Sequence, residues 1–495
     1  MLNAFIINLG STAYSARTLG AYLIATHLRQ EGWDIEVVDY GLEWTLEELK
    51  ELAVSRINQN TKFIGFSHQF ASWGKKFEDF CQWLKKTWPG IILISGCAIN
   101  PNYDTSVIDY HIQGYGEYAI IELLQYLFGN GDKIKFSLFT KGAKQIIPAN
   151  DFYQAFPKKS LRAEYQTRDF IEDGEWLSIE TSRGCVFSCD FCNFPVLGIK
   201  GDYTRDADDF ENEIRFNYDN YGVKNYIVVD ETFNDRTEKI TKYADVVEKL
   251  NFIPSFTGFM RADLLVARPR DKEELLRMNF IGHYYGIETF NRASGKSIGK
   301  GMETSRLQEG IVDIKNYFQN NNRKLFRGTI SLIVGLPEET VETMENTKKW
   351  LVDKWQQQSF YAYSLQIPVD PQDTFSKFGK DYKKYGYEVM TAEEIASLGI
   401  DIHELYNHYH FSSGIMKNSL QWKNKDMNIF QSVQIAIELQ NLKSKYQFGI
   451  DCWNMSSPGF VGEVEDRLIP NCSADQAKIN FQNKVRRYIQ KKLSL

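Results

Sequence analysis

Short apolar strands alternate with helical segments in two stretches of the chain, and this pattern constrains the fold more than any other feature. In the first stretch the strand candidates are residues 4–8, 36–39, 63–67, 91–95 and 108–113. Strands that alternate with helices at these lengths form βαβ units, which build a parallel sheet. We therefore expect an α/β domain over residues 1–145, with any ligand beyond the C-terminal ends of its strands.

A second set of strand candidates follows a weakly patterned linker at residues 146–172. They are residues 177–181, 226–230, 256–259, 284–287, 329–334 and 362–367. Six βα units predict a partial (β/α)6 barrel over residues 173–372, with its site at the C-terminal strand ends. Residues 373–495 lose this alternation and show helical patterns, such as residues 430–445. We interpret them as a mainly helical C-terminal cap domain that closes the barrel mouth.

Length and charge exclude several classes of protein. A chain of 495 residues suits two or three domains. The formal net charge of −6 argues against a dedicated nucleic-acid-binding protein, and we interpret the basic C-terminal residues as a solvated helix face. No apolar run approaches the roughly 18 residues that span a bilayer, and the N-terminus has no signal-peptide pattern. We therefore expect a soluble cytoplasmic protein with no membrane partner.

Three of the seven cysteines lie on one short segment, directly after the first strand of the predicted barrel. The segment 183–193 is RGCVFSCDFCN, which places Cys185, Cys189 and Cys192 on a loop at the functional end. A [4Fe–4S] cluster is normally held by four thiolates, so three thiolates leave one iron open to a substrate. A structural zinc site usually has four ligands, and no fourth cysteine or histidine lies nearby in sequence. The loop therefore predicts a [4Fe–4S] cluster with one open iron.

The spacing C-x3-C-x2-C after a strand resembles the signature of the radical S-adenosylmethionine (SAM) superfamily, over about residues 175–370. The resemblance implies an enzyme whose open iron binds the methionine end of SAM. Segments at later strand ends are similar to the family's SAM-contact motifs in the same order, although Asp-Glu-Thr at 230–232 replaces the common Gly-Gly-Glu. The implied SAM contacts are Phe191, Asp230, Glu231, Arg261, Glu288, Val334 and Leu336.

The N-terminal domain resembles the Rossmann-like (flavodoxin-like) cobalamin-binding domain of class B radical SAM enzymes. The resemblance lies in a Ser-Gly turn at 95–96 and in Gly-Tyr-Gly-Glu at 114–117, where Tyr115 departs from the family's Gly-Glu-Gly-Glu. Small residues at strand ends let a corrin ring approach the backbone. The Asp-x-His-x-x-Gly motif of other cobalamin proteins is absent, so we expect no histidine ligand in place of the tail base. The implied cobalamin contacts are Leu9, Ser67, His68, Gln69, Gly96, Tyr115, Gly116 and Glu117.

Together these resemblances imply three cofactors, a [4Fe–4S] cluster, SAM and cobalamin, and methylation of an unactivated carbon through a 5′-deoxyadenosyl radical and methylcobalamin. Two alternatives stay open. One is a rearrangement, ring contraction or cyclisation with the same cofactors, and the other is an iron–sulfur electron-transfer or assembly protein without turnover. The N-terminal cysteine triplet of methylthiotransferases is absent, which disfavours sulfur insertion.

The expected partners are a reductant such as flavodoxin or ferredoxin and a substrate that the sequence does not identify. The cap residues Tyr406, His408, Tyr409, His410 and Trp453 suit a small aromatic compound, a peptide or a nucleotide-linked compound alike. The sequence also leaves the oligomeric state open.

Overall fold

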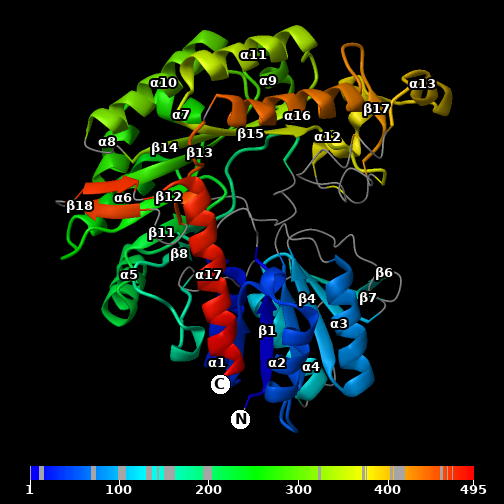
Figure 1. Cartoon of the computed structure of the whole chain (residues 1–495), viewed down its shortest axis with the longest axis vertical. Helices are drawn as coiled ribbons and strands as arrows, with labels where there is room; N and C mark the ends of the chain where they lie inside the picture. The colour runs from blue at the N-terminus through cyan, green and yellow to red at the C-terminus, as the bar shows by residue number, and fades with distance from the viewer. Residues whose placement is uncertain are drawn as a thin grey trace.

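The computed structural model of the chain contains two parallel sheets, which form two lobes, one above the other in Figure 1. The lower lobe is the N-terminal domain and the upper lobe is the barrel. The structure describes residues 2–10, 16–68, 74–97, 107–129, 137–141, 144–149, 162–192, 203–321, 325–370, 374, 376–401, 405, 419–446, 448–456, 461–464, 467–470 and 472–495.

The N-terminal sheet has the strand order β2-β1-β3-β4-β5-β7-β6, and only the edge strand β6 of this sheet runs antiparallel to its neighbour. The order reverses between β1 and β3, which is the switch point where such sheets bind ligands beyond their carboxyl ends. The strands are β1 (Ala4–Asn8), β2 (Ile35–Val38), β3 (Phe63–Ser67), β4 (Ile92–Cys97), β5 (Tyr110–Gln113), β6 (Phe139–Lys141) and β7 (Lys144–Pro148).

Helices cover both faces of this sheet because successive strand residues point to opposite sides. Ile6 of β1 packs with the helices α1 (Gly20–Gln30) and α4 (Glu117–Phe128). Its neighbours Phe5 and Ile7 pack in a second core with three helices on the other face. Those helices are α2 (Leu46–Arg56), α3 (Gly74–Thr87) and α17 (Ala474–Leu493).

The C-terminal part was expected to close the barrel mouth, but the last helix, α17, packs mainly against the N-terminal domain. It runs down beside the N-terminal domain and packs there through Val485, Tyr488 and Ile489 (Figure 1). Lys484 and Lys492 are buried and pair with Glu175 at 2.7 Å and Glu36 at 2.8 Å. The interpretation of the basic C-terminal residues as a solvated face is therefore wrong for these two lysines, because each has a buried carboxylate as its partner.

The second sheet has six parallel strands in consecutive order, which is the predicted partial (β/α)6 barrel. Its strands are β8 (Trp176–Ile179), β11 (Asn225–Val228), β12 (Ser255–Met260), β13 (Phe280–Glu288), β14 (Arg327–Val334) and β15 (Ser359–Ser364). The helices of this lobe are α5 (Ala207–Tyr221), α6 (Thr237–Val247), α7 (Ala262–Ala267), α8 (Arg270–Arg277), α9 (Arg292–Ser297), α10 (Thr304–Asn320), α11 (Val341–Lys354) and α16 (Ile429–Lys445).

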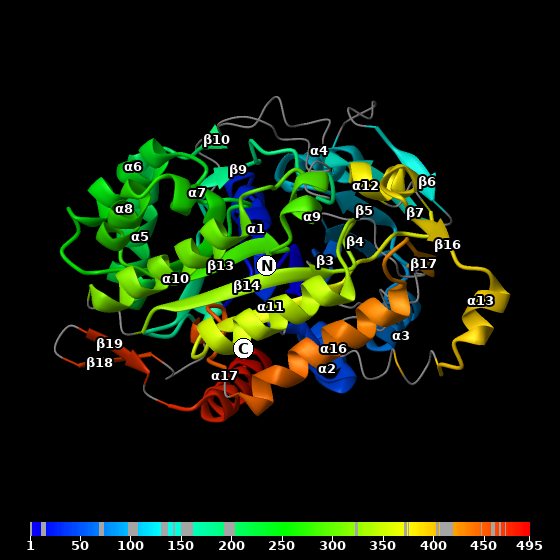
Figure 2. The same cartoon turned by 90° about the horizontal axis from the view of Figure 1, so that it is seen from above.

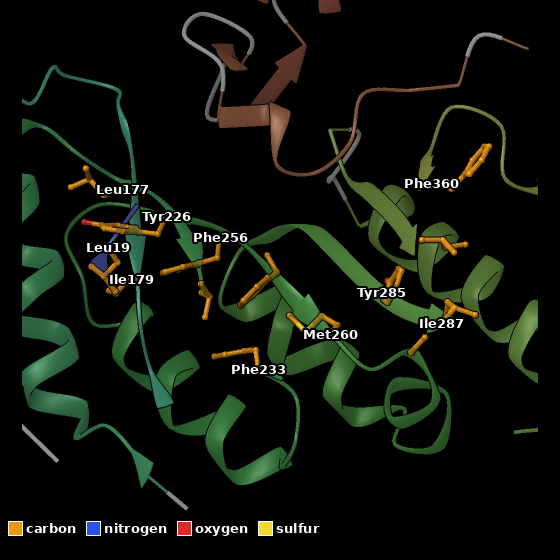
Figure 3. Close-up of a cluster of buried hydrophobic side chains, with 14 of the residues drawn as sticks. Leu19, Leu177, Ile179, Tyr226, Phe233, Phe256, Met260, Tyr285, Ile287 and Phe360 are labelled. Atoms are coloured by element: carbon orange, nitrogen blue, oxygen red, sulfur yellow. The ribbon is translucent and has the colours of Figure 1, made fainter. Parts of the chain in front are cut away.

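The outer face of the barrel sheet forms a continuous apolar core with these helices. Figure 3 shows Phe256, Met260, Tyr285 and Ile287 in this layer, and each is at most 4% exposed. Since side chains alternate along a strand, the residues between them face the concave inner side of the sheet. That inner side lies at the centre of the lobe and is the place for a ligand.

The elements of the region predicted as a cap pack in several different parts of the molecule. Figure 2 shows α16 beside α11, and the Gln440 side-chain amide donates to the Ala362 carbonyl of β15 at 3.0 Å. The helix α16 therefore belongs to the outer layer of the barrel, whereas α12 (Lys377–Lys380) and η6 (Tyr382–Tyr385) lie beside the cysteine loop. Within the described residues, no helix is both long and apolar enough to span a membrane. Smaller elements are β16 (Glu388–Val389), α13 (Ala392–Ser397), β17 (Trp422–Lys423), β18 (Val461–Val464) and β19 (Arg467–Pro470).

A buried arginine joins the two lobes. The Arg17 guanidinium is 1% exposed and donates to Glu175 at 2.6 Å and to Asp39 at 2.7 Å. Although burial opposes its ionisation, Arg17 and Lys484 lower the pKa of Glu175 to about 2. Because Asp39 follows β2 and Glu175 precedes β8, this network fixes the N-terminal sheet against the start of the barrel.

Candidate functional site

The cysteine loop begins at the C-terminal end of the first barrel strand, after the short strand β9 (Ser182–Arg183), which pairs with β10 (Tyr203–Thr204). Cys185, Cys189 and Cys192 take part in no disulfide and are half-buried. The amide of Asp190 donates to the Ile298 carbonyl at 3.1 Å, and the Asp190 carbonyl accepts from the Phe378 amide at 2.9 Å. The loop is thus held between the turn after α9 and the segment around α12.

The surroundings of the three thiols suit an iron–sulfur cluster. Nη1 of Arg261 lies 3.6 Å from the Cys189 sulfur, and the Thr232 hydroxyl lies 3.7 Å from the Cys185 sulfur. A positive group beside a cysteine favours the thiolate, which is the form that binds iron. Among the described residues, no three acidic, histidine or cysteine side chains converge closely enough for a single metal ion. A [4Fe–4S] cube binds each thiolate at a different iron and so holds its ligands further apart.

The side chain of Asp190 fixes the middle of the loop. Its carboxylate accepts from the Tyr385 hydroxyl at 2.8 Å and pairs with Lys377 at 3.1 Å. Asp190 stands between two of the cysteines, but sequence reasoning did not assign it a role. Its partners lie almost 200 positions further along, so no local pattern could have revealed them.

Asp230, one of the predicted SAM contacts, is fully engaged with the protein. Its buried carboxylate accepts from the amides and hydroxyls of both Thr181 and Ser182 at 2.5–3.1 Å. Lys239 adds a charge contact at 3.6 Å. Asp230 therefore braces the turn that leads into the cysteine loop, and we do not propose it as a SAM contact.

Two other predicted SAM contacts are brought together by a lysine that the sequence analysis did not select. Lys300 donates to the Glu288 carboxylate at 2.9 Å and to the Gly286 carbonyl at 2.6 Å. Its ammonium lies 5.5 Å from the centre of the Phe191 ring. Glu288 itself has a φ of 66°, a left-handed conformation that is uncommon for a residue with a side chain. Strain of this kind is concentrated at functional sites.

The segment after β14 is tied to the segment after β13 through Glu339. This buried carboxylate accepts from the Thr289 hydroxyl at 2.8 Å and from the Gly335 amide at 2.8 Å. Val334 and Leu336, the predicted adenine contacts, are buried beside it, and their carbonyls accept from the amides of Leu365 and Glu339. Glu339 thus positions two neighbouring strand ends at the mouth of the barrel.

We expect Glu339→Gln to change how stability depends on pH. Burial raises the pKa of Glu339 from 4.5 to about 7. The folded chain therefore keeps this proton over a range in which the unfolded chain loses it, so the contribution to stability is full below about pH 4.5 and falls as the pH rises through about 7. Without this titration, the glutamine oxygen can accept from the Gly335 amide and its amide nitrogen can donate to the Thr289 hydroxyl. Urea unfolding should therefore show the variant gaining stability relative to the parent over that interval.

The exposed Glu345 of α11 provides the matched control for this experiment. Its carboxylate is 57% exposed and pairs with Lys348 at the surface. Glu345→Gln should give a stability profile parallel to that of the parent. Parallel profiles for Glu339→Gln as well would show that Glu339 is ionised in the folded protein at neutral pH.

The predicted cobalamin contacts lie along the carboxyl edge of the N-terminal sheet, beside the switch point. The Leu9 amide donates to the Ser67 carbonyl at 2.9 Å, and the His68 amide donates to the Gly96 carbonyl at 3.1 Å. Among the described residues, a Cβ added to Gly96 would have a single neighbour, at 3.8 Å, which leaves the described backbone there open to a ligand. Gln69 lies outside the described residues, and His68 is buried with its ring 6.2 Å from that of His111.

The remaining predicted cobalamin contacts touch the barrel directly. Glu117 accepts from Arg183 at 2.6 Å, and the Tyr115 hydroxyl donates to Glu231 at 2.6 Å. The Arg183 guanidinium also lies 4.0 Å from the centre of the Tyr115 ring and pairs with Glu180. Gly116 stands at the N-terminus of α4 between these two contacts. The carboxyl edge of the N-terminal sheet therefore faces the carboxyl edge of the barrel.

This contact holds more acids than bases in a buried space. Burial raises the pKa of Glu180 to about 8 and also raises the pKa of Glu231. Burial opposes the ionisation of Glu117 too, but its ion pair with Arg183 lowers the pKa of Glu117. One oxygen of Glu231 is buried without a hydrogen-bond partner among the described residues. That oxygen is an acceptor open to a donor group such as the amino group of SAM.

A three-cysteine loop at the mouth of a partial parallel barrel is the arrangement expected of a radical SAM domain. Residues 179–351 match the family model of the radical SAM superfamily. The prediction of this superfamily, and of an enzyme, is thereby confirmed.

Two similar proteins are named as a methylthiotransferase and a methyltransferase. The chain is 23% identical to the ribosomal protein uS12 methylthiotransferase RimO of Thermosipho melanesiensis, over 53% of this chain and 66% of that protein. It is 23% identical to an uncharacterized methyltransferase of Pyrococcus horikoshii, over 35% of this chain and 36% of that protein. The matches thus span about two thirds of the first relative and about one third of the second.

Solved structures share the fold over nearly the whole chain. TsrM from Kitasatospora setae, a radical SAM methyltransferase solved with cobalamin and a [4Fe–4S] cluster, has a TM-score of 0.64 at 13% identity and covers 98% of this chain and 100% of its own. The cobalamin-dependent SAM radical enzyme OxsB has a TM-score of 0.56 at 14% identity and covers 92% and 65%. The predicted arrangement of an N-terminal α/β domain before a radical SAM barrel is therefore confirmed as a fold.

Proposed function

We propose that this chain is a cobalamin-dependent radical SAM enzyme that methylates an unactivated carbon. One observation carries the proposal: the carboxyl edges of both sheets face each other, through the contacts Glu117–Arg183 and Tyr115–Glu231. Ligands of such sheets bind beyond these edges. A cofactor on the N-terminal sheet and a cofactor on the cysteine loop would therefore share one space.

The residues that would hold the cluster and SAM lie around the barrel mouth. Cys185, Cys189 and Cys192 would bind three irons, and Arg261 would stabilise the thiolates from the side of Cys189. Glu231, with its open oxygen, and Glu288 would accept hydrogen bonds from polar groups of SAM. When bound, the cluster and SAM supply a 5′-deoxyadenosyl radical, and cobalamin supplies the methyl group.

Cobalamin would lie across the ends of β1, β3 and β4, where Gly96 leaves the backbone open. Gly10 supports this placement, since it adopts a φ of 67° at the end of β1 and no described residue lies within 4 Å of an added Cβ. We propose that His68 does not bind the cobalt of cobalamin, because its ring is buried beside His111 within the domain. A reductant such as flavodoxin or ferredoxin would supply the electrons.

Methyl transfer is favoured over the methylthio transfer in the name of RimO. The N-terminal domain contains two cysteines, Cys81 and Cys97, and Cys81 is buried in α3. Burial raises the pKa of Cys81 far above its usual range, so this thiol is a poor metal ligand. The domain therefore offers too few thiols for a second cluster.

The proposal is tested with anaerobically reconstituted protein that is supplied with hydroxocobalamin, SAM and a strong reductant. We expect bound cobalamin, methyl transfer from SAM to cobalamin, and formation of 5′-deoxyadenosine. Formation of 5′-deoxyadenosine without any cobalamin uptake would show that the chain is a radical SAM enzyme that does not depend on cobalamin. Cobalamin uptake without cleavage of SAM would contradict radical chemistry.

We expect Glu288→Gln to weaken SAM binding about ten- to hundredfold. A hydrogen bond to a charged group contributes about 1.5–3 kcal/mol, which corresponds to that range of affinity. Equilibrium dialysis of SAM against cluster-loaded protein measures the loss without turnover. Glu303→Gln is the control, because Glu303 pairs with Arg292 at the surface and is 51% exposed. Equal SAM affinities in both variants would place the cofactor away from Glu288.

A further inference from the structure

The inner face of the barrel carries a wall of aromatic rings close to the proposed SAM site. Phe259 and Trp453 have their ring centres 4.7 Å apart, and Tyr284 lies 5.2 Å from Phe259 and 5.4 Å from Trp453. Tyr361 continues the wall at 6.3 Å from Tyr284, and Tyr363 follows at 6.0 Å from Tyr361. We call these five residues the aromatic wall.

The strand pattern places this wall inside the barrel. Tyr285 points outward into the helix-packed core, so its neighbour Tyr284 points inward (Figure 3). The same alternation turns Phe259 inward beside the outward-facing Met260. Tyr284 precedes Glu288 by four residues on β13, which corresponds to about 13 Å along the strand. Tyr284 therefore lies deeper in the barrel than Glu288, whereas Phe259 and Tyr363 lie one residue before the ends of β12 and β15.

The protein's own described side chains fill only part of this inner face, where Trp453 and Met455 pack in a buried cluster with Ile281. They leave Phe259 uncovered. Phe259 is 37% exposed, although it lies in a central strand of the barrel. Tyr284, Ile333 and Tyr363 are half-buried, whereas the outward-facing residues of the same strands are buried. Large aromatic surface in such a place is typical of a ligand site.

The wall has no charge of its own, and its polar groups are tyrosine hydroxyls and the Trp453 indole N–H. The Tyr284 hydroxyl is hydrogen-bonded to Ser331 and Tyr363. The Asp451 carboxylate already accepts from the Tyr361 hydroxyl and from backbone amides. Glu288, which acts electrostatically on Tyr284, is paired with Lys300 at 2.9 Å. The Lys443 ammonium lies 4.0 Å from the centre of the Tyr361 ring. Among the described residues, a cationic ligand would thus meet a like charge and carboxylates that already have partners.

From this arrangement we infer that the part of the substrate that enters the barrel is an uncharged aromatic ring. The inference rests on the proposed function, because it names the substrate of that same site. The rings of Phe259, Tyr284 and Trp453 contact one another and form a continuous surface, against which one further ring stacks. An aromatic cage for a cation would instead direct separate ring faces toward one centre.

Four small probes test the chemistry of the occupant. They are benzyl alcohol, benzylamine, benzoate and cyclohexylmethanol, which differ in charge or in aromaticity at nearly constant size. Binding is followed by saturation-transfer NMR on the anaerobic, cluster-loaded protein with saturating SAM. We expect benzyl alcohol to bind at least about tenfold more tightly than benzylamine or benzoate, since an unpaired charge is costly to bury. We expect the saturated ring to bind more weakly than benzyl alcohol.

Phe259→Leu keeps the wall apolar but removes one ring. This substitution should weaken the binding of benzyl alcohol about two- to tenfold. Phe128→Leu is the matched control, because Phe128 is 41% exposed on α4, outside the barrel. No effect of Phe259→Leu, or a Phe128→Leu effect of equal size, would overturn the placement of the ligand. The probe series on the unaltered protein stands independently of both variants.

Three other results would overturn the inference. Preference for benzylamine would identify a cation site, and equal binding of all four probes would show no selection for a ring. Competition between benzyl alcohol and SAM would assign the wall to the cofactor. If 5′-deoxyadenosine forms but benzyl alcohol does not bind, the inference fails and the proposed function stands. If benzyl alcohol binds but SAM is never cleaved, the proposed function fails instead.

Discussion

Replacing Cys185, Cys189 and Cys192 together by alanine is expected to remove the iron–sulfur cluster and all cleavage of SAM. Reconstituted parent protein should contain about four irons and four sulfides per chain. The triple variant should contain almost none, because the three thiols are half-buried, outside any disulfide and on one loop. Iron and sulfide analysis measures the first effect, and formation of 5′-deoxyadenosine measures the second.

The control is Cys472→Ala, which removes a thiol of similar exposure outside the loop. It should leave the iron content unchanged. The triple variant should also fold, since the loop is held by its backbone, through Asp190 with Ile298 and Phe378. A full cluster in a folded triple variant would place the iron elsewhere and remove the basis of the proposed function.

The two sheets could be predicted from the sequence because their strands are short local patterns. The strands β1 and β3 begin and end where the apolar runs begin and end, since turn residues or charges stand at both ends of each run. The barrel strands followed the same rule, with boundaries that differ by a few residues at some ends. Strand β13 begins four residues before the predicted range, because its first residues pack near α7 and α8 and continue the sheet.

The surface against which a helix packs could not be predicted in the same way. The sequence shows that one face of α17 is apolar, but not which surface covers that face. Lys492 has the spacing of a solvent-facing residue, yet it pairs with Glu36, which is 456 positions away. An ion pair of this kind depends on the complete fold.

In the candidate site too, local patterns could be predicted from the sequence, whereas contacts between distant residues could not. The cysteine spacing is local and identified the loop directly. By contrast, Tyr115 looked like a departure from a family motif, and the structure gives it a partner, Glu231, 116 positions away. Arg183 belongs to the cysteine segment, but the sequence offered no sign that its partner is Glu117 on the other domain. Sequence patterns thus located both edges, and the contact between them required the structure.

Arg183→Met is expected to destabilise the fold by about 3–5 kcal/mol near neutral pH, because it leaves buried carboxylates without their partner. Arg183 is 1% exposed and donates to Glu117 at 2.6 Å and to Glu180 at 2.9 Å. Both acids must then ionise without a counter-charge or keep a proton that the unfolded chain releases. Urea unfolding should therefore show a smaller loss at pH 5 than at pH 8, since holding those protons costs less in acid.

The matched control for this substitution is Arg277→Met. Arg277 pairs with Asp245, Glu248 and Glu274, but it is 31% exposed, and surface pairs contribute about 0–1 kcal/mol. A second variant, Arg183→Met with Glu117→Gln, should recover part of the loss, because it removes the Glu117 carboxylate that Arg183 holds ionised. If Arg183→Met costs no more than Arg277→Met, or if its cost does not change with pH, the two carboxyl edges are not held together by this ion pair. The shared space on which the proposed function depends would then need another source.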